Sequence, residues 1–196
     1  MAIEEAAYDV VLTDDAIEVR DFSAYLVAEV TVEGEATQAG NRAFRPLFRY
    51  ISGANRKQEK IAMTAPVTQA PEGEKIAMTA PVVQAPDPDS ETPRWVVGFV
   101  MPATYTLDTL PMPTDKTIRI REVPARRVVA IRYSGTWSEA RYTQHLQQLT
   151  AWLEARNLTA KGEPVWARYN SPMTLWFMRR NEIWIEIDPD ASLDRQ

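Results

Sequence analysis

The sequence has no cysteine, a single histidine and only seven glycines among its 196 residues. Without cysteine, the protein has no disulfides, thiolate catalysis, zinc ribbons or iron–sulfur clusters. With one histidine, His145, a multi-histidine metal site is excluded and any Ser-His-Asp triad would have to use that residue. The glycines form neither G-x-G-x-x-G nor a Walker pattern, so no phosphate-binding loop is predicted.

Charge and hydropathy exclude further classes of protein. The formal net charge of −5 gives no basic surface for nucleic acid. The chain has no run of about eighteen apolar residues and no charged-then-apolar amino terminus, so neither a membrane span nor a secretory signal is expected. A content of 45% hydrophobic and 25% charged residues is typical of ordinary globular domains. Together with the missing cysteines, these features favour a single cytoplasmic domain spanning residues 1–196.

A tandem duplication dominates the middle of the chain. Residues 59–71 read EKIAMTAPVTQAP and residues 74–86 read EKIAMTAPVVQAP, so the copies differ only at Thr68 and Val83. Apolar residues alternate within each copy, which predicts strands with one buried face. We therefore interpret residues 59–86 as an inserted double hairpin that turns at Glu72-Gly73.

Two details of this hairpin bear on its role. Pro66 and Pro81 cannot donate to a ladder, so each copy should lie at a sheet edge or break at its proline. Met63 and Met78 fall on the face predicted to be buried. These methionines either fill gaps in the core or form a flexible apolar wall of a ligand pocket.

A second, longer repeat relates the two halves of the chain at an offset of 101 residues. Residues 8–102 form one half and residues 114–188 the other, separated by an irregular, proline-containing stretch. The aligned pairs are Ile17/Ile118, Val19/Ile120, Arg20/Arg121, Asp21/Glu122, Ala24/Ala125, Val27/Val128, Val30/Ile131 and Gly34/Gly135. The repeat predicts an α+β fold in which two pseudo-symmetric β-β-α-β halves join into one antiparallel sheet or distorted barrel, flanked by two helices. A ligand pocket would then be expected where the halves meet.

Helical spacing of apolar residues follows each glycine of the repeat. The first stripe runs from Ala36 to Ile51 and contains Pro46, which should kink the helix or begin a new segment. The second helix is expected from Trp137 to Arg156, with Ser138 near its start and Asn157 as its stop. The strands that close the second half are predicted at residues 165–169 and 183–187.

Several strings resemble the SOUL haem-binding protein family. The most specific are KIAMTAPV at residues 60–67 and RRNEIW at residues 179–184; FRPLFRYISG at residues 44–53 adds to them. The resemblance extends from about Tyr8 to Ile187. It implies a distorted antiparallel barrel with two long helices, similar to gyrase-inhibitor-like effector-binding domains. It also implies non-covalent binding of haem or another tetrapyrrole in an apolar cleft beside the first helix.

The residues allow such a site, and they also allow a purely structural reading. Phe44 and Phe48 lie four apart on one helical face, opposite the walls that Met63 and Met78 would supply. Basic residues for the propionates would come from the same helix: Arg42, Arg45 and Arg49. On the structural reading, the phenylalanines belong to the core stripe and the arginines are solvated.

Iron ligation and ligand charge are left open by the sequence. His145 is the favoured candidate for an axial ligand, with Met63 or Met78 as the weaker alternative. A lone histidine on the shoulder of a helix is more often a partly exposed residue. Glu182, Glu186 and Asp188 form a carboxylate cluster that either selects cationic ligands or lies on the wet face of an edge strand. A haem carrier, buffer or sensor is favoured over a tetrapyrrole-modifying enzyme or a module for other apolar or cationic small molecules.

Overall fold

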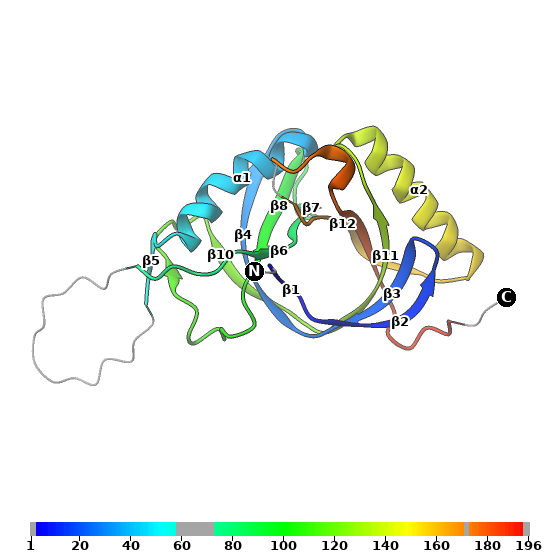
Figure 1. The fold of residues 1–196 in the computed structure, drawn as a ribbon, viewed down its shortest axis with the longest axis horizontal. Helices are drawn as coiled ribbons and strands as arrows, with labels where there is room; N and C mark the ends of the chain where they lie inside the picture. Colours follow the sequence, from blue (N-terminus) through cyan, green and yellow to red (C-terminus); the bar gives the residue numbers. More distant parts are fainter. Residues whose placement is uncertain (1–2, 58–72, 171–172, 194–196) are drawn as a thin grey trace, which may run out of the picture.

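The computed structural model describes residues 3–57, 73–170 and 173–193 (Figure 1). Within these residues the protein is an α+β fold, built on one large antiparallel sheet with a helix packed beside each end of it. The whole first copy of the tandem repeat, with Met63, Pro66 and Thr68, lies outside the described residues. The predicted pairing between the two copies is therefore not tested by the structure.

The sheet has nine strands in the order β10-β4-β8-β7-β12-β13-β11-β3-β2. Each neighbouring pair is antiparallel. In chain order, the strands are β2 (Tyr8–Asp14), β3 (Ile17–Phe22), β4 (Tyr25–Glu33), β7 (Val82–Pro86), β8 (Arg94–Val100), β10 (Arg119–Val123), β11 (Arg126–Tyr133), β12 (Ala160–Arg168) and β13 (Asn181–Ile187). Two small sheets pair β1 (Glu4–Glu5) with β6 (Thr79–Ala80), and β5 (Asn55–Arg56) with β9 (Met112–Pro113). A short 3-10 helix, η1, spans Trp176–Met178.

Helix α1 (Ala36–Ile51) packs against β4 and β8 through a narrow stripe of small and large apolar residues. Its buried side includes Ala39, Ala43 and Leu47, each fully inaccessible. Burying a leucine of this kind contributes about 1.5–3 kcal/mol, so the stripe fixes the helix on the sheet. The helix is one continuous element with Pro46 inside, and no new segment begins at the proline.

Helix α2 (Glu139–Ala155) packs against β11 and β13 and buries Leu149 and Leu153. It begins two residues later than predicted because Ser138 is the cap, its side chain accepting a hydrogen bond from the Arg141 amide at 3.4 Å. After the last helical turn, Asn157 adopts a φ of 54°, which confirms it as the stop. None of the helices in the described part of the chain is long and apolar enough to cross a membrane.

Two expectations about strands were wrong. Strand β13, which carries Glu182 and Glu186, lies between β12 and β11 and is not at an edge of the sheet. In the second copy of the tandem repeat, Met78 is 41% exposed, because regular pairing begins only at Thr79 and the predicted alternation does not extend back to it. The break at Pro81, between β6 and β7, agrees with the prediction.

Apolar residues are buried on both faces of the sheet. One cluster lies under α1, a second under α2, and a third on the opposite face around Phe22, Tyr169 and Trp184. The third cluster surrounds the polar groups described below. Residues Arg168 and Tyr169 at the end of β12 therefore contribute to different faces of the sheet.

Candidate functional site

A pocket of about 290 Å³ lies beside the first half of α1. Its lining comes from α1, from the second copy of the tandem repeat, from the residue before the cap of α2 and from the end of β12. Most of these residues are apolar or aromatic: Ile3, Gly40, Asn41, Phe44, Met78, Thr79, Ala80, Val82, Trp137, Arg168, Tyr169 and Asn170. The pocket is thus an apolar slot that draws on both halves of the chain.

Two aromatic residues on α1 extend this slot toward solvent. Phe44 and Phe48 are stacked with ring centroids 5.5 Å apart and an interplanar angle of 13°. Phe44 is half-buried and also contacts Phe99, whereas Phe48 is 46% exposed. An aromatic side chain as exposed as Phe48 is an apolar surface suited to a flat ligand.

Arg168 lies in the wall of the pocket and is buried, with 6% of its surface exposed. Within the described part of the chain, its Nε and Nη2 atoms have no hydrogen-bond partner. Its guanidinium lies 4.1 Å from the ring centroid of Trp166 and 5.2 Å from that of Trp137. Burial lowers the pKa of Arg168 to about 10, which still leaves the guanidinium charged at neutral pH.

The residues around this guanidinium are held in place by other contacts. The Trp137 indole N–H donates to the Asn181 side chain at 2.8 Å. Gln84 Nε2 donates to the Ala36 carbonyl at 2.8 Å, while its Oε1 atom is buried without a partner in the described structure. A Cβ atom at Gly40 would lie 2.4 Å from Arg168 Nη1, so only glycine leaves room for the guanidinium here.

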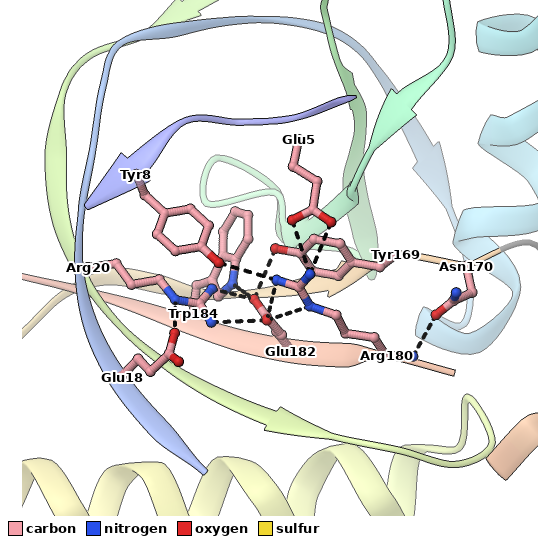
Figure 2. Close-up of polar contacts among 9 residues, drawn as sticks. All are labelled: Glu5, Tyr8, Glu18, Arg20, Tyr169, Asn170, Arg180, Glu182 and Trp184. Atoms are coloured by element: carbon pink, nitrogen blue, oxygen red, sulfur yellow. Dashed lines mark hydrogen bonds and ion pairs between the residues drawn. The ribbon is translucent and has the colours of Figure 1, made fainter. Parts of the chain in front are cut away.

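On the opposite face of the sheet, a polar network centres on Glu182, which is fully buried (Figure 2). Arg20 donates to both carboxylate oxygens, at 2.7 and 3.1 Å, and its Nε donates to Glu18 at 2.7 Å. Arg180 Nε donates to the same carboxylate at 2.9 Å. Tyr169 and Trp184 complete the shell at 3.0 and 2.7 Å.

The protonation state of Glu182 follows from this shell. Burial alone would raise the pKa of its carboxyl, but the hydrogen bonds and charges of Arg20 and Arg180 outweigh burial and lower it. Glu182 is therefore ionised, and the positive charges of Arg20 and Arg180 balance its negative charge. It leaves no free buried negative charge to attract a cationic ligand.

Two residues connect the network to the pocket. Tyr169 lines the pocket and donates to Glu182, and the Arg180 side chain stacks over the Tyr169 ring at 3.7 Å. Asn170 also lines the pocket and accepts from the Arg180 amide at 2.5 Å. Figure 2 shows Tyr169 and Arg180 beside the Glu182 carboxylate, and Asn170 farther away at the Arg180 backbone. The network fixes the end of β12 and with it one wall of the pocket.

The structure brings together only some of the predicted site residues. Phe44 and Met78 line the pocket and Phe48 stacks on Phe44, while Met63 lies outside the described residues. Arg42 is turned away, since it donates to the Glu33 carbonyl at 2.6 Å and to Gln38 at 3.1 Å. Arg45 and Arg49 are exposed on α1.

His145 is half-buried on α2 and is not part of the pocket lining. Its ring stacks on Tyr133 with centroids 4.0 Å apart, and its Nδ1 lies 2.7 Å from the Arg141 carbonyl. Among the residues that the structure describes, no three His, Asp or Glu side chains gather as a metal site would require. Any iron ligation by His145 would involve this residue alone.

The sequence analysis missed six polar or aromatic residues of the pocket: Asn41, Thr79, Trp137, Arg168, Tyr169 and Asn170. Arg168 was not singled out because it lies in a strand whose alternation gives no sign of an unpaired charge. The only available signal was its place in the pattern, since a charged residue between Ala167 and Tyr169 ends a largely apolar strand.

A larger cavity of about 1050 Å³ lies along the β4–β8–β7 part of the sheet, on the face opposite α1. Its walls carry ion pairs, including Glu29 with Arg121 at 3.0 Å and Glu33 with Arg94 at 2.9 Å. Charges paired in this way are satisfied without a ligand. The smaller pocket has the continuous apolar lining that small-molecule sites usually show, so we regard it as the candidate site.

A curved antiparallel sheet with two helices and an apolar pocket beside the first helix is typical of small-molecule-binding domains. The family model described as "SOUL heme-binding protein" matches residues 3–74 and 68–186, and the chain belongs to this family. The two matches overlap within the tandem repeat, as a duplicated KIAMTAPV segment would produce.

Individual relatives agree with this assignment. Heme-binding protein 1 of Mus musculus is 27% identical over 162 residues, covering 82% of this chain and 77% of the relative. Heme-binding protein 1 of Xenopus laevis is 26% identical, covering 86% of this chain and 82% of the relative. Among solved structures, the EcmrR C-terminal domain superposes with a TM-score of 0.61 over 92% of this chain and 98% of its own, at 11% identity. At that identity the last comparison establishes the fold alone.

Proposed function

We propose that the protein binds haem or a related tetrapyrrole non-covalently in the pocket beside α1 and acts as a carrier, buffer or sensor. The observation that carries the proposal is the apolar slot at Phe44 and Met78, continued by the exposed Phe48, in a chain of the SOUL family. A flat macrocycle needs apolar surface on its faces, and these side chains supply it. The names of the mouse and frog relatives support the same class of ligand.

The residues of the pocket fit a tetrapyrrole in two respects. The pocket volume of about 290 Å³ is at the lower end for small-molecule sites, so it suits one edge of a macrocycle whose remainder lies along Phe48. The unpaired N–H groups of Arg168 fit a carboxylate at the buried edge. A haem bound there would bring its own redox-active iron, while the protein would bind the ring, orient it and exclude water from the buried edge.

The exposed arginines of α1 complete the proposal at the rim. Arg45 and Arg49 lie on the helix that carries Phe48 and are available for an outward-facing propionate. Exposed ion pairs of this kind contribute at most about 1 kcal/mol each. Their role would be to orient the ligand and to speed its capture.

His145 is the proposed axial ligand, and its geometry gives a specific condition. Its Nδ1–H donates to the Arg141 carbonyl, which leaves Nε2 as the nitrogen with a free lone pair, as in many metal-binding histidines. Because His145 does not line the pocket, it would hold the iron only of a haem that extends beyond the pocket lining. His145→Gln should then change the Soret position while leaving porphyrin affinity nearly unchanged.

A hemin titration tests the proposal. The wild-type protein should show a saturable Soret change at micromolar hemin, and Phe48→Asp should weaken binding at least about tenfold because it places a charge on the apolar rim. Val10→Asp is the matched control, since Val10 is exposed to 49% and Phe48 to 46% but Val10 lies on β2. The absence of saturable binding by the wild type would overturn the proposal, and so would equal losses in the two variants.

We also infer that the domain is an internal duplication, with a distorted barrel formed by residues 8–102 and 114–188 around the inserted hairpin 59–86. The strand order supports this inference. Exchanging β3 with β10, β4 with β11, β7 with β12 and β8 with β13 reproduces the eight-strand order β10-β4-β8-β7-β12-β13-β11-β3 in reverse. Superposition of Ile17–Gly34 on Ile118–Gly135 in an experimental structure tests the pseudo-symmetry directly.

A further inference from the structure

The wall of the pocket contains a buried cation that no carboxylate of the described structure neutralises. Arg168 is 6% exposed, and two of its three guanidinium nitrogens are buried without a hydrogen-bond partner in the described residues. Other arginines on the same sheet do have such partners: Arg126 pairs with Glu186 at 3.1 Å and Arg127 with Asp21 at 2.7 Å. Arg168 therefore differs from its neighbours in lacking a counter-ion.

This arrangement is costly in the absence of a ligand. A buried charge without a hydrogen-bonding partner loses solvation that nothing replaces, and each unmade hydrogen bond of a charged group costs more than that of a neutral one. The rings of Trp166 and Trp137 recover part of the loss by cation–π attraction. They leave the N–H groups in the plane of the guanidinium unsatisfied.

Arg168 and Gly40 both line the pocket. Gly40 of α1 provides the space for Nη1, since a Cβ atom there would come within 2.4 Å. Phe44 and Tyr169 supply the apolar walls on either side. Nε and Nη2 are covered in the structure, so a carboxylate that entered the pocket would pair with them after a small shift of the guanidinium. The site is sheltered from water, where charge-assisted hydrogen bonds are strongest.

We propose that Arg168 binds a carboxylate of the ligand inside the pocket, so that the site selects flat apolar carboxylates and rejects lipophilic cations. The proposal rests on the function proposed above. It adds the chemical class of the ligand and the residue that recognises it. It also assigns an orientation: the acidic edge of the ligand lies inside and its apolar body lies along Phe44 and Phe48. Glu182, already neutralised by Arg20 and Arg180, offers no competing site for a cation.

The competing explanation is that Arg168 is purely structural, filling the space between Trp166 and Trp137. The two explanations predict opposite effects on the unliganded protein. If Arg168 serves only to stack between Trp166 and Trp137, Arg168→Met should lower the midpoint of unfolding. If Arg168 is held for a carboxylate, Arg168→Met removes an unpaired buried charge, and the midpoint should stay the same or rise.

Binding is measured with metal-free protoporphyrin IX and with its dimethyl ester, by quenching of tryptophan fluorescence. The free acid should bind the wild type about 10–100-fold more tightly than the ester, which has the same ring but no charge. Arg168→Met should remove this difference, so that its affinities for acid and ester agree within about threefold. Arg132→Gln, at an exposed arginine on β11 outside the pocket lining, is the control and should keep the preference for the acid. Tetraphenylphosphonium, a lipophilic cation, should not compete.

The aromatic carboxylate 2-naphthoate, small enough for the pocket alone, separates failure of this inference from failure of the proposed function. If acid and ester bind the wild type equally, or Arg168→Met keeps the preference for the acid, the inference is wrong while tetrapyrrole binding stands. If neither porphyrin binds but 2-naphthoate binds the wild type and not Arg168→Met, the inference stands and the proposed function is wrong. If no carboxylate binds, or tetraphenylphosphonium displaces the bound acid, the inference is wrong.

Discussion

Arg20 and Arg168 are both buried arginines of the same sheet, with 2% and 6% of their surfaces exposed. Arg20 donates from all three guanidinium nitrogens to carboxylates, two of them to the fully buried Glu182. Arg168 meets two indole rings and leaves two nitrogens unpaired within the described residues. On one face of the sheet an arginine makes hydrogen bonds from every guanidinium nitrogen, whereas on the other face an arginine leaves two of these nitrogens unpaired.

The difference shows how a charged residue that stabilises the fold can be distinguished from one that binds a ligand. The first has its hydrogen-bond partners within the protein, and the second does not. A buried ion pair with all its hydrogen bonds made is held by the fold, and removing one member exposes the other to an uncompensated environment. A buried charge whose hydrogen bonds are not made destabilises the folded protein. It is tolerated only if a ligand supplies the missing partners or if the charge serves another purpose. Three changes test this contrast.

The largest effect is expected from Arg20→Met. It leaves Glu182 buried with one arginine where it had two, and should lower the free energy of unfolding by about 3–5 kcal/mol. Urea denaturation of this variant beside Arg168→Met measures the contrast directly. A loss of less than about 1 kcal/mol for Arg20→Met, or equal losses for the two variants, would remove the distinction between the arginines.

Lowering the pH should destabilise the folded protein by protonating Glu182, the partner of Arg20. The pKa of Glu182 is lower in the folded protein than its reference value of 4.5, so its contribution to stability is complete above that pH and is lost as the pH falls through the folded pKa. The Glu182→Gln variant should therefore lose less of its remaining stability than the wild type between pH 5 and about pH 2. Asp188→Asn, at an exposed carboxylate with a lowered pKa, is the control and should keep most of the wild-type pH dependence. Parallel curves for the wild type and Glu182→Gln would show that this carboxylate does not control acid unfolding.

The smallest effect is expected from Gly40→Ala. Alanine normally stabilises a helix interior by about 0.8–1 kcal/mol relative to glycine, but here its Cβ would press on Arg168 and displace the guanidinium. We expect little or no gain in unfolding free energy and about a threefold to tenfold loss of affinity for the porphyrin acid. Gln38→Ala, at an exposed position of the same helix outside the pocket lining, should leave that affinity nearly unchanged. A full gain in stability with unchanged affinity would mean that the space at Gly40 does not matter.

Much of the fold followed from the sequence because it depends on repeated local patterns. The 101-residue offset predicted matching strands and helices in both halves, and the structure has a helix after each of Gly34 and Gly135 in one antiparallel sheet. Phe44 and Phe48 were expected on one face of a helix, and their rings stack. Helical and strand spacing are local properties, so they can be read without knowing the tertiary contacts.

The charges of the site could not be predicted in this way. Glu182 was placed with Glu186 and Asp188 by proximity in sequence, yet it is fully buried and its partner Arg20 is 162 residues away. Arg168 was not selected at all, because a missing partner is visible only when all the neighbours are known. Arg42 was expected at the site, but a carbonyl at the end of β4 holds it elsewhere.

The amino-terminal segment is joined to the rest of the molecule at several places. Strand β1 pairs in parallel with β6, and Glu5 forms an ion pair with Arg180 at 3.0 Å, while Ile3 lines the pocket. Fusion proteins and affinity tags attached ahead of Ile3 would therefore emerge beside the mouth of the pocket. A carboxy-terminal tag is the better choice for any assay of ligand binding.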